Sequence, residues 1–405
     1  MSKKLFIITV SVVLVLFLIS LIGYYFMITR NSDTSSENPS GFSFFPFGSN
    51  DDSTPTSSGE AGTEANKPSA QNYTAKLRKI SATPVAGAGV LDVKAGTIIR
   101  HIEKATGHIY ETELFSPNQN RISNTTIPTV YDAIWGNKNL SLIARYLKEN
   151  DYTVDTYSLT IKEVSTTTEN TISGITFPSN ISDVSIFGST VFYLEQKQDS
   201  SIGYTSDFSG KNRRQIWNSP IKELLPQFVN GRTVALTTKP EQNIPGFLYF
   251  VDTSSGGIRK ILGNINGLSS LTSPDAGQVL YLTEESDAIL SIYNIKAKSA
   301  RTLTPITFPE KCVWSKKDLN VIYCAVPRES LGGNSLISWY KGLVSFSDDI
   351  WKYDIKNNTA DIAENLSAES GEPIDVVKLL LSDSEQYLVF INKRDNTLWS
   401  LDLSK

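Results

Sequence analysis

Residues that could carry out acid–base, metal or nucleophilic chemistry are scarce in this sequence. Two histidines, His101 and His108, and two cysteines, Cys312 and Cys324, occur among 405 residues. Neither pair has the spacing of a zinc site, and no nucleophile elbow, phosphate-binding loop or dinucleotide fingerprint is present. We therefore predict no metal, no cofactor and no catalytic set, and we interpret both histidines as ordinary strand residues.

Paired acids leave one enzymatic alternative open. Asp348-Asp349 and Glu284-Glu285 could suggest a glycan hydrolase, which needs two carboxyl groups about 5 to 10 Å apart across a cleft. In a chain with many turns, adjacent acids are typical of solvated turns, and we interpret these four in that way. A glycan hydrolase or lyase of the cell envelope therefore stands as the alternative to a non-enzymatic function.

The two cysteines predict a cross-link. Cys312 and Cys324 stand in two strand-like runs joined by residues 315–320, and a hairpin centred on residue 318 places them opposite each other. Opposed residues of an antiparallel pair have Cα atoms about 4.5 to 5.5 Å apart, which suits a disulfide. The alternative is two buried thiols that act as small apolar side chains.

A second candidate site is a long insertion between two predicted strands. Residues 327–349 fill a gap that is much shorter elsewhere in the chain, and they contain Arg328, Trp339, Tyr340 and Lys341. Aromatic and arginine side chains are enriched at binding hot spots, and loops carry much of protein function. We predict a ligand-binding loop; the alternative is that Trp339 and Tyr340 fold back and pack against neighbouring strands.

The elements that would position these residues recur along the chain. Nearly continuous apolar runs such as Val191-Phe-Tyr-Leu and Val279-Leu-Tyr-Leu are each followed by a strand that ends at Asp or Asn. These end residues are spaced 42, 60 and 48 positions apart: Asp252, Asn294, Asp354 and Asp402. A period in the forties with one insertion is typical of the four-stranded blade of a β-propeller.

The count of units follows from the outermost strands. Six such strands follow the Asp or Asn turns, whereas the last unit ends at residues 403–405 without one. An unassigned strand of the same type, residues 76–81, opens the domain and can complete that unit, which removes the open edges of a ring. We predict an all-β, seven-bladed β-propeller over residues 75–405; six or eight blades are alternatives because residues 131–178 are less regular.

Two turns resemble a known family. Leu271-Thr-Ser-Pro-Asp275-Ala-Gly277 looks like the Ser-Pro-Asp-Gly turn of TolB-type and WD-repeat-like propellers, and Leu381-Ser-Asp383 is similar. Ala276 interrupts the motif, and the His and Trp-Asp signatures of true WD repeats are absent. The resemblance implies a propeller fold and an extracytoplasmic binding role, and it carries no catalytic residues.

The N-terminus predicts a membrane anchor. Residues 5–28 contain 24 positions without a charge, and roughly 20 apolar residues cross a bilayer as a helix. The run ends in aromatic residues and not in a cleavage site, although a removed signal peptide is the alternative. Lys3 and Lys4 keep residues 1–4 in the cytoplasm, and residues 29–74 have the composition of a flexible, disordered linker.

The predicted topology places residues 75–405 outside the cytoplasm, where Cys312 and Cys324 are expected to form a disulfide. Acids and bases are nearly balanced, with 38 basic and 42 acidic residues, so nucleic acid is not an expected partner. We predict a single-pass membrane protein whose propeller binds a protein, a peptide or an envelope glycan without catalysis. A structural subunit of an envelope assembly is a third class.

Overall fold

The computed structural model describes residues 73–123, 125–148, 153–162, 171–241, 243–284 and 287–405. All of them belong to one compact unit. The predicted span, residues 5–28, and all of the predicted linker except Tyr73 and Thr74 lie outside the described residues. In the described part of the chain, no helix combines the length and the apolar character that crossing a membrane requires.

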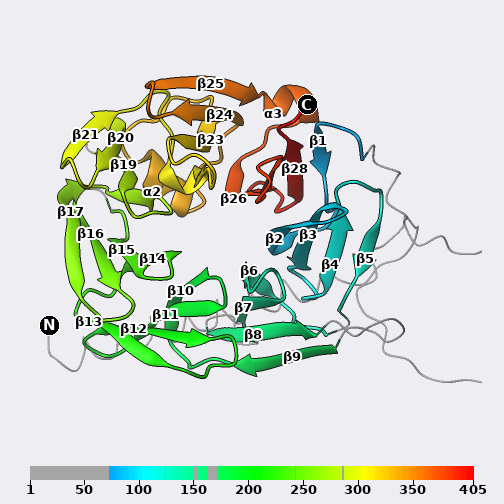
Figure 1. Cartoon of the computed structure of the whole chain (residues 1–405), viewed down its shortest axis with the longest axis horizontal. Helices are drawn as coiled ribbons and strands as arrows, with labels where there is room; N and C mark the ends of the chain where they lie inside the picture. Colours follow the sequence, from blue (N-terminus) through cyan, green and yellow to red (C-terminus); the bar gives the residue numbers. More distant parts are fainter. Residues whose placement is uncertain (1–72, 124, 149–152, 163–170, 242, 285–286) are drawn as a thin grey trace, which may run out of the picture. The chain divides into compact units, whose positions relative to one another are not determined.

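Seven antiparallel sheets of four strands each are arranged in a ring (Figure 1). The strands of blades 1 to 4, in chain order, are β2 (Val85–Val93), β3 (Gly96–Glu103), β4 (Ile109–Glu113) and β5 (Gln119–Arg121); β6 (Val130–Gly136), β7 (Ser141–Leu147), β8 (Val154–Lys162) and β9 (Thr171–Thr176); β10 (Ile181–Phe187), β11 (Thr190–Gln196), β12 (Ser201–Asp207) and β13 (Arg214–Ser219); β14 (Leu224–Asn230), β15 (Thr233–Thr238), β16 (Pro245–Asp252) and β17 (Ile258–Asn266). The predicted fold class is confirmed.

The remaining blades contain the three short helices of the described residues. The elements of blades 5 to 7 are β18 (Ser269–Thr272), β19 (Gln278–Glu284), β20 (Ala288–Asn294) and β21 (Ser299–Thr302); η1 (Pro309–Lys311), β22 (Cys312–Trp314), β23 (Val321–Pro327), α2 (Ser335–Tyr340), β24 (Asp348–Asp354) and β25 (Thr359–Glu364); α3 (Leu366–Ser370), β26 (Val376–Leu381), β27 (Tyr387–Asn392), β28 (Leu398–Asp402) and β1 (Leu77–Lys79). The predicted count of seven blades is confirmed in the less regular residues 131–178 as well, because β6 to β9 form a complete four-stranded sheet there.

Strand position within a blade follows the apolar pattern of the sequence. The second strand of a blade is covered on both faces, and in β11 the four residues Val191 to Leu194 are all at most 1% exposed. The outermost strands of blades 1 and 5 face solvent, and all residues of β5 and β21 are exposed. Continuous apolar runs therefore mark the blade interior, and polar runs mark the rim.

The hydrophobic core lies between the blades. Among the described residues, seven buried clusters fill the ring, and each joins residues of two neighbouring sheets. The cluster between blades 1 and 2, for example, packs Ile102 and Ile109 against Leu142 and Val130. Each blade is thus stabilised by both neighbours, and the ring has to be closed for every blade to have two.

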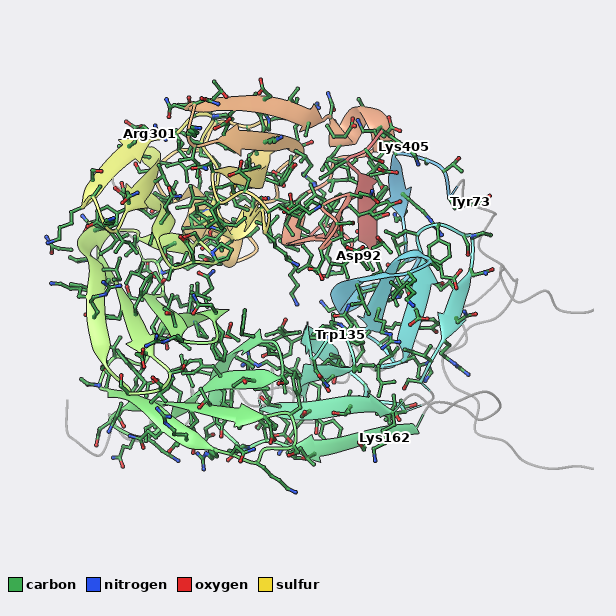
Figure 2. All side chains as sticks on the ribbon, viewed as in Figure 1. Tyr73, Asp92, Trp135, Lys162, Arg301 and Lys405 are labelled. Atoms are coloured by element: carbon green, nitrogen blue, oxygen red, sulfur yellow. A yellow bond between two sulfur atoms is a disulfide. The ribbon has the colours of Figure 1, made fainter. Side chains whose placement is uncertain are left out.

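The N-terminal strand closes the ring as the sequence predicts. β1 pairs antiparallel with β28, with Leu77 opposite Leu401, and the Ile80 amide donates to the Leu398 carbonyl at 2.7 Å. Leu77 is buried in the cluster between blades 6 and 7. Figure 2 shows Tyr73 and Lys405 at the same part of the rim, where Lys405 Nζ donates to the carbonyl of Thr74 at 2.9 Å.

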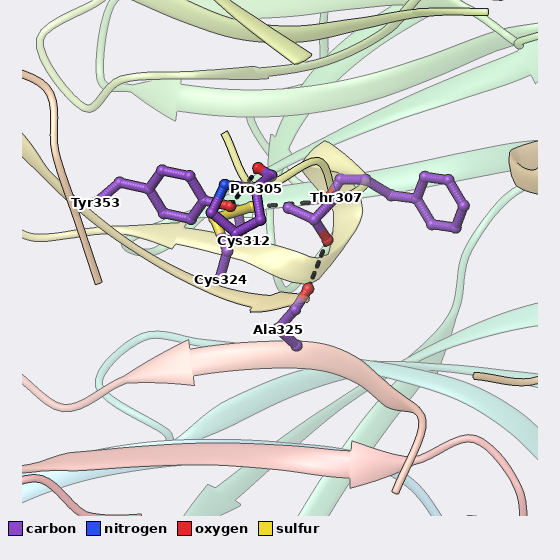
Figure 3. The surroundings of a disulfide bond; sticks show 7 residues. Pro305, Thr307, Cys312, Cys324, Ala325 and Tyr353 are labelled. Carbon is purple, nitrogen blue, oxygen red and sulfur yellow. Dashed lines mark hydrogen bonds between the residues drawn. A yellow bond between two sulfur atoms is a disulfide. The ribbon is translucent and has the colours of Figure 1, made fainter. Parts of the chain in front are cut away.

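A disulfide joins the first two strands of blade 6. Cys312 pairs with Cys324 in the β22–β23 register, as the predicted hairpin requires, and their Sγ atoms are bonded (Figure 3). Both side chains are buried. Beside them, the Thr307 hydroxyl donates to the Ala325 carbonyl at 2.5 Å, and the Tyr353 hydroxyl donates to the Pro305 carbonyl at 2.7 Å.

We expect both cysteines to resist alkylation when the protein is extracted without reductant, unfolded in denaturant and analysed by mass spectrometry. Reduction should lower the free energy of unfolding by at most about 3 kcal/mol, because the bond closes a short loop and constrains the unfolded chain little. The Cys312→Ala/Cys324→Ala variant is the control and should be insensitive to reductant. Free alkylation of both residues in the unreduced protein would contradict the cross-link.

Candidate ligand-binding groove

The long insertion of blade 6 connects its second and third strands. β23 continues to Pro327 and β24 begins at Asp348, so the connection is 328–347 and slightly shorter than the predicted 327–349. It contains α2 (Ser335–Tyr340). In an antiparallel blade, such a connection lies at the same end of the sheet as the connections between blades, because alternate strands run in opposite directions.

The insertion leaves its own blade and lies over blade 5. Gly332 forms a bridge with Asp287, and the Leu336 amide donates to Glu284 Oε1 at 3.1 Å. Glu284, the last residue of β19, is 1% exposed, and Asp348, the first residue of β24, is fully buried. The interpretation of Glu284 and Asp348 as solvated turn charges is therefore wrong, because the insertion and the neighbouring blade cover them. It is also wrong for Asp349, which is buried in β24, and Glu285 lies outside the described residues.

Trp339 anchors the insertion from within. Its side chain is 5% exposed and lies against Phe308 and Phe346. Its Nε1 donates to both carboxylate oxygens of Asp375 at 3.1 Å. The aromatic ring thus packs beneath α2 and does not face the surface, so the packing alternative describes Trp339.

A buried ion cluster lies next to this ring. Lys311 Nζ donates to Asp348 Oδ2 at 2.6 Å and to Asp375 Oδ1 at 2.5 Å, and all three side chains are fully buried. Burial raises the pKa of Asp348 to about 6, although Lys311 opposes that rise. Lys311 Nζ also lies 4.9 Å from the centroid of the Trp339 ring. The cluster joins η1, β24 and the start of blade 7 to the insertion.

An open groove of about 780 Å³ separates α2 from blade 4. One wall is formed by Ile337, Tyr340 and Lys341 of the insertion, and the other by residues around blade 4, 220–223, 238–241 and 244–247. Leu268 lies between the two walls. The preceding residue, Gly267, has no room for a side chain, because a Cβ there would come within 2.8 Å of the Cβ of Glu284. All of these segments connect strands at the same end of the blades.

The groove has an apolar interior and charged edges. Its apolar lining residues are Pro220, Ile221, Pro240, Ile244, Pro245, Phe247, Leu268, Ile337 and Tyr340. Ile244 is 57% exposed and Tyr340 is 38% exposed, so both present surface to an incoming ligand. On the rim, Lys239 and Glu223 form an exposed ion pair at 3.5 Å, which contributes little to stability.

The structure divides the predicted site residues into two groups. Tyr340 and Lys341 line the groove, whereas Trp339 is buried below it. Arg328 is bound elsewhere in its own blade: its guanidinium donates to Asp349 at 2.9 and 2.8 Å and also to Asn365. These contacts raise the pKa of Arg328, since the hydrogen bond to Asp349 favours the charged form.

The wall from blade 4 was not predicted from the sequence. Three prolines and an isoleucine stand in its connections, at Pro220, Pro240, Pro245 and Ile244. An exposed isoleucine between prolines could have indicated a binding surface, because a loop that contacts only solvent gains no stability from a rigid apolar segment. Which blade such a loop faces depends on contacts distant in sequence.

The histidines have no place in the groove. His101 is buried in β3, stacks on Tyr110 at 5.5 Å between ring centroids, and is kept neutral because burial lowers its pKa to about 4. His108 directly precedes β4. Within the described ranges, no group of three or more His, Cys, Asp or Glu side chains is arranged to hold a metal ion.

Comparison with known proteins identifies a fold. The sequence matches no protein-family model and no curated protein sequence. Among solved structures, an oligogalacturonate lyase from Vibrio parahaemolyticus is similar with a TM-score of 0.54 and 8% identity, covering 80% of this chain and 93% of the lyase. TolB from Acinetobacter baumannii also matches, with a TM-score of 0.40 and 12% identity over 78% of this chain and 63% of that one.

At these identities the similarity to the lyase concerns the course of the backbone and not its chemistry. The predicted propeller is supported by the strand order of the seven sheets and by this match. The chain is a seven-bladed β-propeller whose first strand completes its last blade.

Proposed function

We propose that this protein is a non-enzymatic, membrane-tethered binding module whose groove takes an extended peptide segment of a partner protein. The observation that carries the proposal is the groove between α2 and blade 4, which combines an apolar interior, an exposed aromatic ring and lysines on its edges. Concave sites of this composition are the usual binding sites of proteins.

The lining favours a peptide over a glycan. A glycan presents many hydroxyl groups, and each one that is buried against proline and isoleucine side chains without a hydrogen bond is unfavourable. Aliphatic side chains of a peptide would instead remove apolar surface from water at about 25 cal/mol per Å². Among the described residues, no acid lies within salt-bridge distance of Lys341, so a carboxylate on the peptide has a partner there.

The proposed location follows from the sequence. Residues 5–28 are the proposed membrane anchor, with residues 1–4 in the cytoplasm and the propeller on the other side. A buried disulfide suits an extracytoplasmic domain. The partner would then be a protein of the same membrane or of the adjacent envelope.

The enzymatic alternative has less support at the groove. A general acid needs surroundings that raise its pKa, such as an apolar pocket. Two acids line the groove, Glu223 and Glu241, and both are exposed; the side chain of Glu223 is 75% exposed and paired with Lys239. The buried acids Glu284 and Asp348 hold the insertion and do not line the groove.

We expect Tyr340→Ala and Lys341→Glu to weaken peptide binding, each by at least about 2 kcal/mol, or roughly 30-fold in Kd, as at other interface hot spots. The probe is a peptide selected from a random display library on the full chain in detergent, and the measurement is isothermal titration calorimetry. We expect the selected peptides to be apolar with at least one acidic residue.

The matched controls are Tyr73→Ala and Lys356→Glu, which change an exposed tyrosine and an exposed lysine that do not line the groove. Both should bind as the unchanged chain does. If the protein selects no peptide but retains glycans on an array, and Tyr340→Ala abolishes that retention, the peptide proposal is wrong and the groove binds glycans.

A further inference from the structure

Two carboxyl groups from different blades hold the two ends of α2. Glu284, at the end of β19, accepts the Leu336 amide at 3.1 Å near the start of the helix. Glu310, in η1, accepts the hydroxyl of Tyr340 at the end of the helix and the hydroxyl of Ser269 at 2.6 Å. Because Ile337 and Tyr340 form one wall of the groove, these two acids fix the position of that wall.

Neither acid is neutralised by a cation of the described residues. Among the described residues, no lysine or arginine lies within salt-bridge distance of Glu284 or Glu310, and Lys311 is bound to Asp348 and Asp375 instead. The second oxygen, Oε2, of both Glu284 and Glu310 is buried and has no hydrogen-bond partner. Without such contacts, a negative charge on either acid is unfavourable to bury.

Charge makes this arrangement unfavourable when both acids are ionised. Burial raises the pKa of Glu284, and the charge of Glu310 raises it further, while backbone amides of the insertion oppose the rise. Burial also raises the pKa of Glu310, against the hydrogen bonds from Ser269 and Tyr340 and the nearby charge of Lys311. A proton on either acid removes one buried charge.

We propose that Glu284 and Glu310 form a proton-dependent clamp on α2, so that the groove wall is held more firmly when the pair takes up a proton. The inference deepens the proposed function, because it concerns regulation of the same groove. Acid would order the wall formed by Ile337 and Tyr340 and thereby favour ligand binding.

The direction follows from linkage. A carboxyl group whose pKa is higher when the insertion is folded than when it is open stabilises the folded insertion by taking up a proton. This stabilisation is complete when the pH is below the ordinary pKa of about 4.3. The stabilisation is lost as the pH rises through the pKa that the group has in the folded insertion. Other titratable groups around the pair are Lys311, Tyr340, Asp183 and Asp287. Burial, Glu310 and Asp183 raise the pKa of Tyr340, so its hydroxyl stays protonated and continues to donate to Glu310.

The test is hydrogen–deuterium exchange of the insertion in the full chain, followed by mass spectrometry at about pH 5 and about pH 7.5 and corrected for intrinsic exchange rates. In the unchanged protein we expect the protection of residues 329–347 to be several-fold higher at the lower pH. Glu284→Gln and Glu310→Gln keep an oxygen acceptor and lack the charge. Because Asp348, which follows the insertion, also titrates in this range, the comparison is made at each pH: both variants should be more protected than the unchanged protein at the higher pH, and this difference should disappear at the lower pH.

The matched control is Glu223→Gln, an exposed acid on the opposite rim, which should leave the pH dependence unchanged. Protection that does not depend on pH, or variants that lose protection at both values, would show that the acids are simple anchors and would overturn the proposal. Exchange is measured without ligand, so its outcome is separate from peptide binding. A groove that binds no peptide but becomes protected in acid refutes only the proposed function.

Discussion

Replacing Lys311 with methionine is expected to lower the free energy of unfolding by about 3 to 5 kcal/mol at neutral pH. Lys311 is the cation shared by Asp348 and Asp375, and all three side chains are fully buried. Methionine fills a similar volume, but it leaves Asp348 in the interior without a counter-ion and Asp375 with only the more distant Lys393, whose Nζ lies 4.0 Å from Asp375 Oδ2. The measurement is urea denaturation of the full chain in detergent, from the shift of the transition midpoint.

The same variant should recover part of its stability in acid. The pKa of Asp348 is already raised to about 6 in the native fold, so its ionisation opposes folding as the pH rises through that value. Without Lys311 the acid should protonate at still higher pH. The loss caused by the substitution should therefore be smaller at about pH 5 than at about pH 7.5.

Lys316→Met provides the matched control for this substitution. Lys316 also pairs with an aspartate, Asp383, but both side chains are more than half exposed. Exposed ion pairs contribute about 0 to 1 kcal/mol, so this variant should unfold almost as the unchanged protein does. Equal losses in the two variants would show that the buried cluster is not what stabilises this part of the ring.

Trp339→Ala is expected to lower the free energy of unfolding by about 3 to 5 kcal/mol, the usual range for a buried tryptophan. The ring packs against Phe308 and Phe346, and its Nε1 is a donor to Asp375, which would lose two contacts. The measurement is again urea denaturation, combined with hydrogen–deuterium exchange of residues 329–347. Loss of protection should be largest in that segment.

Tyr340→Ala separates packing from binding at the neighbouring position. Tyr340 is 38% exposed and lies at the groove, so its removal should change stability by much less than removal of Trp339. The double variant Trp339→Ala/Tyr340→Ala would combine both effects, and the single variants are needed to distinguish them. If Trp339→Ala is as stable as the unchanged protein, the anchoring role of Trp339 is wrong.

Repetition made the fold predictable from the sequence. Second-strand runs such as Val191–Leu194 recur with each blade, and the Asp or Asn at the end of the third strand marks the turn to the outer strand. The closing role of β1 followed from a count, because one unit was short of a strand. Local patterns suffice for these features, since the strands of each blade but the last are consecutive in the chain.

The site was predictable only in part, because it depends on contacts between blades. The length of the insertion and the presence of Tyr340 and Lys341 were visible in the sequence, whereas the facing wall, with Pro240, Ile244 and Pro245, belongs to a different blade. Lys311 looked like an ordinary residue at the start of a strand. Its two partners lie 37 and 64 positions away, and no periodic pattern connects them.

The closure of the ring has a mechanical consequence. The described chain enters blade 7 through β1, which is paired with β28 over three residues, Leu77 to Lys79. If residues 5–28 hold the protein in a membrane while a partner in the groove is pulled away, the tension runs along the chain through Thr74 into this short pairing. Each of blades 1 to 6 is a continuous stretch of chain with four strands, so blade 7 is the point where a load would first open the ring.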